Sequence, residues 1–280
     1  MAYDYELLSV RTDAGVLWCR IDNPPINLIT RQLYRELRKF VTEVAADDSV
    51  LALVFESANP EFFIAHFDVE LILQFPQVEN PQTPTELNAF HALCEQLRTM
   101  GKTTIAKIAG RVGGGGSELA ASCDMRFGLL GATVVNQMEV PIGILPGGTG
   151  TQRLPWLLGR GRALELILGG DDLDAATAER WGYLNRAFAS ADELNEWVDG
   201  LARRIASFPA PAVRAAKQAV GYATPDPTPG LYEEDRLMNT LLATAEAQAA
   251  MRRFLELGGQ TREGELAVGE LNRQVGDVSR

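Results

Sequence analysis

The chain has 280 residues, 46% of them hydrophobic, and a formal net charge of −11. This length accommodates one or two domains, and the acidic balance argues against a general nucleic-acid binder, because phosphates would be repelled. No apolar run approaches the roughly 20 residues of a membrane span. The N-terminus also lacks a basic segment followed by an apolar one, so we expect neither a membrane span nor a secretory signal.

Cysteine and histidine are scarce. The three cysteines, Cys19, Cys94 and Cys123, lie far apart without CxxC spacing, which argues against a zinc site or a disulfide framework and suits a reducing cytosol. Only two histidines, His66 and His91, are present, so we expect no histidine-based metal cluster. His91 lies between apolar residues of a predicted helix, and we expect it to be structural.

The first hundred residues alternate between strand and helix patterns. Residues 3–22 predict two strands around a turn at 13–15. Thr30 is then a typical helix N-cap, and apolar residues follow it at helical spacing. A buried strand is predicted within 49–56, and a Pro/Gln/Asn-rich loop precedes a further helix from residue 87.

The remainder predicts one more strand, over 103–109, running directly into glycines, and then mostly helices. The helical patterns include one long segment over about 231–257. Because strands and helices alternate up to about residue 190, we expect an α/β core over 1–190. A helical region would then follow over 191–280.

A glycine run, Gly113–Gly116, separates that strand from a predicted helix. Glycine runs also occur in flexible loops, but amides at the start of a helix after a strand are suited to bind an anion or oxyanion. A dinucleotide-binding GxGxxG motif would need glycine where the chain has Glu118, and no Gly-Lys-Ser/Thr follows for a nucleoside triphosphate loop.

Two glutamates accompany this run. Glu118 is expected in the first turn of the helix, and Glu139 precedes the apolar segment VPIGILP. Taken singly, the first could complement the helix dipole, and the second could be a surface residue at a strand end. As a pair beside buried sequence, they are candidates for raised pKa values and for proton transfer.

Four segments in order resemble the crotonase (enoyl-CoA hydratase/isomerase) superfamily. They are IDNPPINLIT (21–30), SANPEFFIAHFDVELI (57–72), KIAGRVGGGGSELAASCDMRFG (107–128) and the stretch 137–188 that begins QMEVPIGILPGGTG. The resemblance covers about residues 5–222. It implies an α/β fold, a crotonase-like spiral of repeated β/β/α units with a C-terminal helical region for trimer assembly. Trimers of this family often pair into hexamers.

The resemblance also implies an acyl-CoA substrate and a set of site residues. The backbone N–H groups of Phe67 and Gly115 would form the oxyanion hole for the thioester oxygen. Glu118 would help activate water for attack at C3, and Glu139 would deliver a proton to C2. The further residues expected to contact substrate are Ala65, His66, Asp68, Gly114, Met138 and Gly147.

Because both glutamates are retained, we expect hydration of a 2-trans-enoyl-CoA to a 3-hydroxyacyl-CoA. We expect a cytoplasmic enzyme with no metal or redox cofactor, in which coenzyme A enters only as part of the substrate. Isomerisation, thioester hydrolysis and decarboxylation remain alternatives, as does a non-catalytic protein that binds acyl-CoA or a partner.

The chain departs from the family pattern in three places. His66-Phe67 replaces the usual Gly-Ala, Met138 replaces proline before Glu139, and residues 257–276 extend past the usual ending. The Phe67 ring is expected to narrow the acyl or pantetheine channel. The extension predicts either an arm that binds a partner or a disordered end.

Overall fold

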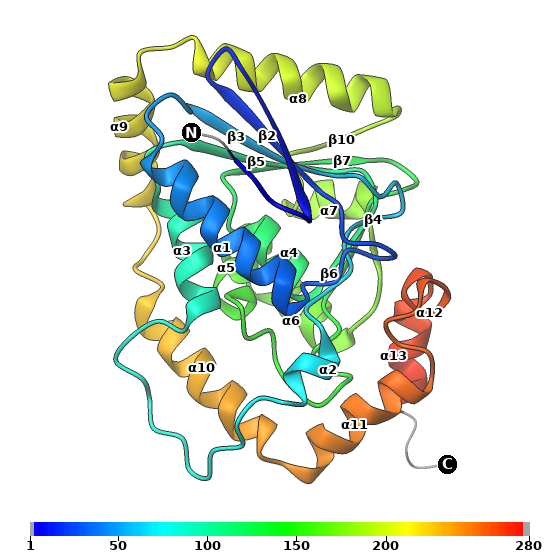
Figure 1. Ribbon diagram of the computed structural model, residues 1–280. Coiled ribbons are helices and arrows are strands. Elements are labelled where there is room, and N and C mark those ends of the chain that lie inside the picture. Colours follow the sequence, from blue (N-terminus) through cyan, green and yellow to red (C-terminus); the bar gives the residue numbers. More distant parts are fainter. Residues whose placement is uncertain (1–2, 277–280) are drawn as a thin grey trace.

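Two sheets form the centre of the computed structural model, which describes residues 3–276 (Figure 1). The larger sheet has the order β1-β2-β3-β5-β7-β10, and the smaller has the order β4-β6-β8-β9. The larger sheet contains β1 (Leu8–Asp13), β2 (Val16–Ile21), β3 (Ala52–Ser57), β5 (Thr103–Ile108), β7 (Met125–Leu129) and β10 (Arg186–Phe188). The smaller sheet contains β4 (Phe62–Ile64), β6 (Arg111–Gly113), β8 (Val134–Asn136) and β9 (Leu173–Asp174).

Helices follow or surround these strands. In chain order they are α1 (Arg31–Ala46), α2 (Val69–Ile72), α3 (Ala89–Thr99), α4 (Gly114–Ala121), α5 (Gly150–Leu158), α6 (Arg160–Gly169), α7 (Ala175–Trp181), α8 (Ala191–Ala206), α9 (Ala210–Gly221), α10 (Thr228–Leu242), α11 (Ala245–Glu256), α12 (Arg262–Leu266) and α13 (Val268–Gly276).

The chain winds as a spiral that contains three copies of one structural unit. In each unit the first strand joins the larger sheet, the second joins the smaller sheet, and one or two helices close the turn. The strand pairs are β3/β4, β5/β6 and β7/β8, and successive units pair in parallel in both sheets. The α/β spiral of β/β/α units expected from the sequence is confirmed.

Local sequence explains the first elements. β1 and β2 pair antiparallel around the turn at 14–15, where Ala14 and Gly15 have φ of 50° and 79°. The Thr30 side chain caps α1 by accepting a hydrogen bond from the Leu33 N–H. The apolar face of α1, with Leu33, Leu37, Phe40, Val41 and Val44, is fully buried. Burying each such side chain contributes roughly 1.5–3 kcal/mol.

The two faces of the larger sheet bury different helices. Val16 and Trp18 of β2 face α8, whereas Leu17 and Cys19 face the core that contains α1. This follows from the two-residue period of a strand. Figure 1 shows α8 lying across one face of the sheet, with α1 and α3 on the other. The domain boundary expected at residue 190 stays a prediction, and α8, directly after it, packs on the sheet.

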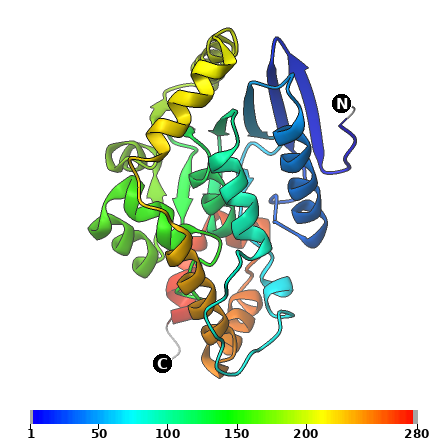
Figure 2. The same ribbon diagram turned by 90° about the vertical axis from the view of Figure 1, so that its left-hand side faces the viewer.

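The helices from α9 onward leave the sheets. The single helix expected over 231–257 is two, because α10 ends at Leu242 and α11 begins at Ala245. Figure 2 shows α10 to α13 gathered at the lower end of the molecule, while α9 stands at the front, uncovered by other segments. Within residues 3–276, no helix has the length and apolar composition needed to cross a membrane.

The extension at 257–276 folds back on its own chain, so the expectation of a disordered end is wrong, whereas binding of a partner by this segment stays a prediction. It forms α12 and α13, and Val268, Leu271 and Val275 join an apolar cluster with α11. The Asn272 side chain donates to the Gly170 carbonyl at 2.7 Å. Apolar burial and this hydrogen bond together hold the extension against the core.

Candidate active site

The glycine run forms the start of a buried helix. β5 ends at Ile108, so it does not run into the glycines as expected, because β6 of the smaller sheet intervenes. Gly113 is the N-cap, and α4 begins at Gly114. Glu118 is therefore the fifth residue of the helix, one turn later than the sequence predicted. All eight residues of α4 are buried, which explains why a glycine-rich segment can remain helical.

Gly114 is required by its surroundings. Its φ is +44°, and a Cβ at this position would lie 2.8 Å from Glu139 Oε1 and 2.9 Å from His66 Cβ. Both the left-handed backbone and the absent side chain therefore favour glycine. This close approach brings the start of α4 against two other segments of the site.

The two predicted oxyanion donors, Phe67 and Gly115, lie side by side. A Cβ on Gly115 would be 3.6 Å from the Phe67 nitrogen. Gly115 is the second residue of α4, and the first four N–H groups of a helix have no acceptor within it. Around Phe67, Ile29 donates to the His66 carbonyl and accepts from the Asp68 N–H. The Phe67 N–H therefore faces away from Ile29.

Glu118 is fixed by a glycine-rich loop. Its Oε1 accepts the N–H groups of Gly148 and Gly150 at 2.8 and 2.7 Å. Burial, together with the negative charges of Glu139 and Glu234, raises the pKa of Glu118 well above its ordinary value, although the two amides act in the opposite direction. The side chain is thus oriented by two amides, while its burial favours the protonated form.

Glu139 lies in a turn three residues after β8 and is also buried, at 7% exposure. Burial raises its pKa to about 7, although its own N–H, the charge of His66 and the Gln137 side chain act in the opposite direction. Gln137 Nε2 donates to Glu139 Oε2 at 3.2 Å. A carboxyl group with this pKa can hold a proton near neutral pH and release it.

A cavity of about 300 Å³ joins these groups, and Glu118, Glu139, Phe67 and Gly115 all line it. Most of its wall is apolar. The aromatic members are Tyr34, Phe67, Phe75 and Phe90, and the aliphatic members are Val69, Ile72, Met138, Ile142, Ile144, Leu145, Met238 and Leu242. The wall of a largely apolar chamber therefore contains two buried carboxyl groups together with Phe67 and Gly115.

The aromatic wall is built around Phe67. Its ring centroid lies 5.9 Å from those of Tyr34 and Phe90, both in edge-on contact, and 6.1 Å from that of Phe75. The Phe67 ring thus forms part of the chamber wall, while the backbone of the same residue lies beside Gly115.

The remaining predicted site residues fall into two groups. His66, Met138 and Gly147 line the cavity. Ala65, Asp68 and Gly114 lie outside its lining, as far as the described residues show. Asp68 instead caps α2 by accepting N–H groups from Glu70 and Leu71, and the Ala65 N–H donates to the Ile26 carbonyl.

His66 is tied to the C-terminal extension. Its Nε2 lies 3.0 Å from Glu265 Oε1, and its Nδ1 lies 2.7 Å from the Phe67 carbonyl. Because both ring nitrogens face acceptors, the charged imidazolium fits this position. Burial lowers the pKa of His66, but Glu265 outweighs it and the net shift is upward. The Glu265 carboxyl has a lowered pKa, despite its burial, because of His66.

Several residues of the site were missed by the sequence interpretation. The wall residues Tyr34 and Phe90 lie on predicted helices, where they match ordinary core positions. Gly148 and Gly150 stand in a Gly-Gly-Thr-Gly loop whose glycines were a usable signal for backbone donors. Within residues 3–276, no group of three or more His, Cys, Asp or Glu side chains could hold a metal ion.

Comparisons with known proteins point to one enzyme family. A family model described as enoyl-CoA hydratase/isomerase matches residues 11–262. The crotonyl-CoA hydratase of Syntrophomonas wolfei is 32% identical over 263 residues, covering 91% of this chain and 96% of that protein. A probable enoyl-CoA hydratase of Mycobacterium bovis is 32% identical over 256 residues, covering 90% and 96%. The solved structure of a putative enoyl-CoA hydratase from Streptomyces avermitilis has 39% identity and a TM-score of 0.89, covering 97% of this chain and 99% of that one.

Proposed function

The chain belongs to the enoyl-CoA hydratase/isomerase family, and we propose that it hydrates a 2-trans-enoyl-CoA to a 3-hydroxyacyl-CoA. One observation carries this proposal: the buried carboxyl groups of Glu118 and Glu139, both with raised pKa values, face the same cavity. An isomerase can move one proton with a single carboxylate. Hydration must activate water and also protonate carbon, so it makes use of two.

The backbone donors would stabilise the charge that develops during attack. As water adds to C3, the electrons of the C2–C3 double bond move onto the thioester oxygen. The N–H groups of Phe67 and Gly115 would bind that oxygen. Fixed dipoles of this kind stabilise an oxyanion without reorganising, and losing one donor typically costs about 3–4 kcal/mol.

Hydrogen bonding supports a division of labour between the carboxyl groups. Glu118 accepts two backbone N–H groups, which offset part of the rise in its pKa. When the pair carries its proton on Glu139, the Glu118 anion would take the proton from the attacking water. Glu139 accepts one side-chain amide and would give its proton to C2 as the thioester carbonyl re-forms. Proton transfer from Glu118 to Glu139 would restore the starting state.

This reaction needs no metal or redox cofactor, because the proton transfers and the oxyanion stabilisation are supplied by the chain. Coenzyme A would enter only as part of the thioester. The apolar wall supports an apolar acyl group as the part of the substrate that occupies the chamber.

Assembly into homotrimers, which could pair into hexamers, is proposed as well. α9 contains no buried residue in a single copy, and near its end Val220 and Tyr222 are 72% and 79% exposed. Covering these side chains with another copy would remove apolar surface from water. Sedimentation equilibrium would give the mass of one chain if this part of the proposal is wrong.

Product identification tests the reaction. Purified protein is mixed with trans-2-enoyl-CoAs of graded chain length, and the enoyl-thioester absorbance is followed while products are analysed by mass spectrometry. Hydration adds the mass of one water. A product of unchanged mass would indicate isomerisation, free coenzyme A would indicate hydrolysis, and carbon dioxide from a carboxylated substrate would indicate decarboxylation. Binding without any of these products would make the chain a non-catalytic acyl-CoA binder.

A further inference from the structure

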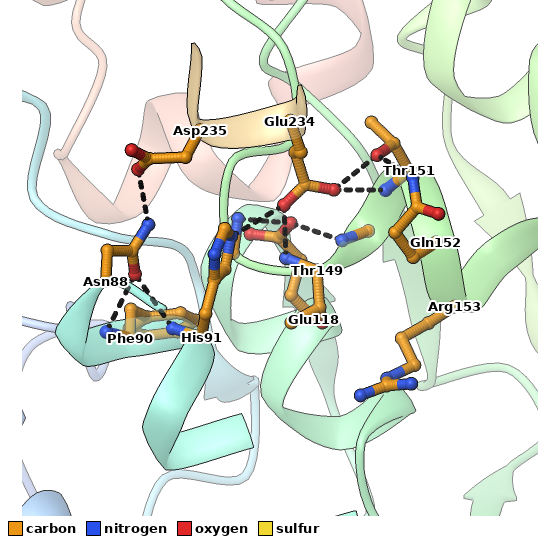
Figure 3. A network of polar contacts seen from close by, with 12 residues as sticks. Asn88, Phe90, His91, Glu118, Thr149, Thr151, Gln152, Arg153, Glu234 and Asp235 are labelled. Atoms are coloured by element: carbon orange, nitrogen blue, oxygen red, sulfur yellow. Dashed lines mark hydrogen bonds and ion pairs between the residues drawn. The ribbon is translucent and has the colours of Figure 1, made fainter. Parts of the chain in front are cut away.

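The loop that orients Glu118 is held from its other side by a second buried carboxylate, Glu234 (Figure 3). Glu118 accepts the N–H groups of residues 148 and 150. Glu234 accepts the N–H groups of Thr149, at 2.7 Å, and of Thr151, at 3.1 Å. The Thr151 hydroxyl also donates to Glu234. Four successive amides are thus divided alternately between two carboxylates.

The backbone of Thr149 makes this alternation possible. Its φ is 101°, a conformation that a β-branched residue rarely adopts, and the residue is fully buried. Such a conformation persists only where its surroundings determine it. On one side, the hydrogen bonds from the amides of residues 149 and 151 to Glu234 hold the loop in this conformation. On the other side, the hydrogen bonds to Glu118 do the same.

Glu234 is itself anchored firmly. It lies on α10, its side chain is fully buried, and Nε2 of His91 on α3 contacts its Oε1 at 2.9 Å. The next residue, Asp235, accepts a hydrogen bond of 2.7 Å from the Asn88 side chain. Asn88 in turn caps α3. Two consecutive acidic residues of α10 therefore bind the start of α3 (Figure 3).

We propose that Glu234 is a positioning residue, which holds the 148–151 loop so that its alternate amides fix the Glu118 carboxylate toward the cavity. His91 fixes Glu234 in turn. The inference rests on the proposed function and adds to it, because it gives α10 a part in orienting the Glu118 carboxylate. The negative charge of Glu234 also contributes to the raised pKa of Glu118.

The kinetic test compares Glu234→Gln with Glu233→Gln. Glutamine is similar in size, but its NH₂ group would face the N–H and hydroxyl of Thr151, so the loop must shift. Misplacing a reacting group by about 1 Å can cost on the order of 100-fold in rate. We expect kcat to fall by roughly 10- to 100-fold with little change in KM. Glu233, which pairs with Arg236 on the exposed side of α10, is the matched control and should keep the native kcat.

A double-mutant cycle separates positioning from general damage. If Glu234 acts through Glu118, Glu234→Gln should cause little further loss in a Glu118→Gln background. An equal loss in both backgrounds, or a native kcat in Glu234→Gln, would overturn the proposal.

Hydrogen exchange gives a readout that is independent of turnover. Amides of the 147–151 segment should exchange faster in Glu234→Gln than in Glu233→Gln, at equal thermal stability. Unchanged exchange would overturn the positioning role even in an active enzyme. If exchange is faster in Glu234→Gln but the native protein hydrates no enoyl-CoA, the proposal that Glu234 holds the loop would stand. The proposed reaction would then be wrong.

Discussion

Gly115 and Phe67 belong to different units of the spiral, yet a Cβ atom on Gly115 would lie 3.3 Å from the Cβ atom of Phe67. The contact aligns an amide at the start of α4 with an amide of the segment after β4. In the proposed function, the N–H groups of these two residues would bind the same thioester oxygen.

Removing one of these donors should abolish most of the activity. Gly115→Pro deletes the N–H, and a lost oxyanion donor costs about 10²–10³ in kcat. Gly115→Ala is the matched control, because it adds a Cβ near Phe67 but keeps the N–H. We expect Gly115→Pro to be at least tenfold slower than Gly115→Ala, with circular dichroism confirming that both fold. Equal rates in two folded variants would exclude this amide from the oxyanion hole.

The pH dependence should report Glu139. Its pKa is raised to about 7, and it must be protonated to act as an acid. The value of kcat/KM should therefore fall as pH rises through about 7. Gln137→Leu removes the hydrogen bond that lowers this pKa, so the falling limb should move to higher pH. If the falling limb stays at the same pH or moves to lower pH in Gln137→Leu, a group other than Glu139 controls the pH dependence.

The pair His66–Glu265 should stabilise the fold within a defined pH window. The pKa of His66 is raised above 6.5, so its contribution is complete below 6.5 and is lost as pH rises through the folded value. The pKa of Glu265 is lowered below 4.5, so its contribution is complete above 4.5 and is lost as pH falls through the folded value. The pair therefore contributes fully between about 4.5 and 6.5.

Urea unfolding of His66→Gln at several pH values checks this window. Within it, the variant should lose about 3–5 kcal/mol, because a buried carboxylate is left without its partner. Above the folded pKa of His66, the difference from the native protein should shrink. Glu263→Gln, an exposed neighbour on α12, is the control. A loss that is the same at every pH would indicate packing rather than charge.

The ring of Phe67 should limit the acyl group. Phe67→Leu keeps the backbone donor but removes the ring that contacts Tyr34 and Phe90. We expect the ratio of kcat/KM for long over short enoyl-CoAs to rise about tenfold or more, since one methylene in a pocket is worth about 10–200-fold. Phe208→Leu, at an exposed position, should leave the ratio unchanged. An unchanged ratio in Phe67→Leu would mean that another residue limits the length of the acyl group.

Local patterns predicted the early elements well. The hairpin and α1 depend on a turn, an N-cap and a helical stripe, all of which are visible within about 20 residues of sequence. The glycine run was harder to place. Its helix begins at Gly114 because the surrounding buried segments exclude water and leave no room for side chains. The sequence of the glycine run does not reveal these surroundings.

Contacts between distant residues could not be predicted in this way. Glu265 pairs with His66 across 199 positions, which is why the extension was expected to be an arm or a disordered end. Glu234 stands between Glu233 and Asp235, and nothing local distinguishes the fully buried carboxylate from its less buried neighbours. The resemblance to a family supplied the oxyanion donors and the two glutamates, whereas the loop that orients Glu118 emerged only from the fold.

The most direct measurement of the central claim is the hydration rate of a trans-2-enoyl-CoA by Glu118→Gln and Glu139→Gln, compared with Glu179→Gln on the exposed surface of α7. General acid–base groups typically contribute about 10²–10⁴-fold. The account predicts a loss of this size in each of the first two variants, with coenzyme A thioester binding retained, and a native rate in the third. A near-native rate in either Glu118→Gln or Glu139→Gln would show that its carboxylate is not needed for proton transfer and would contradict the account.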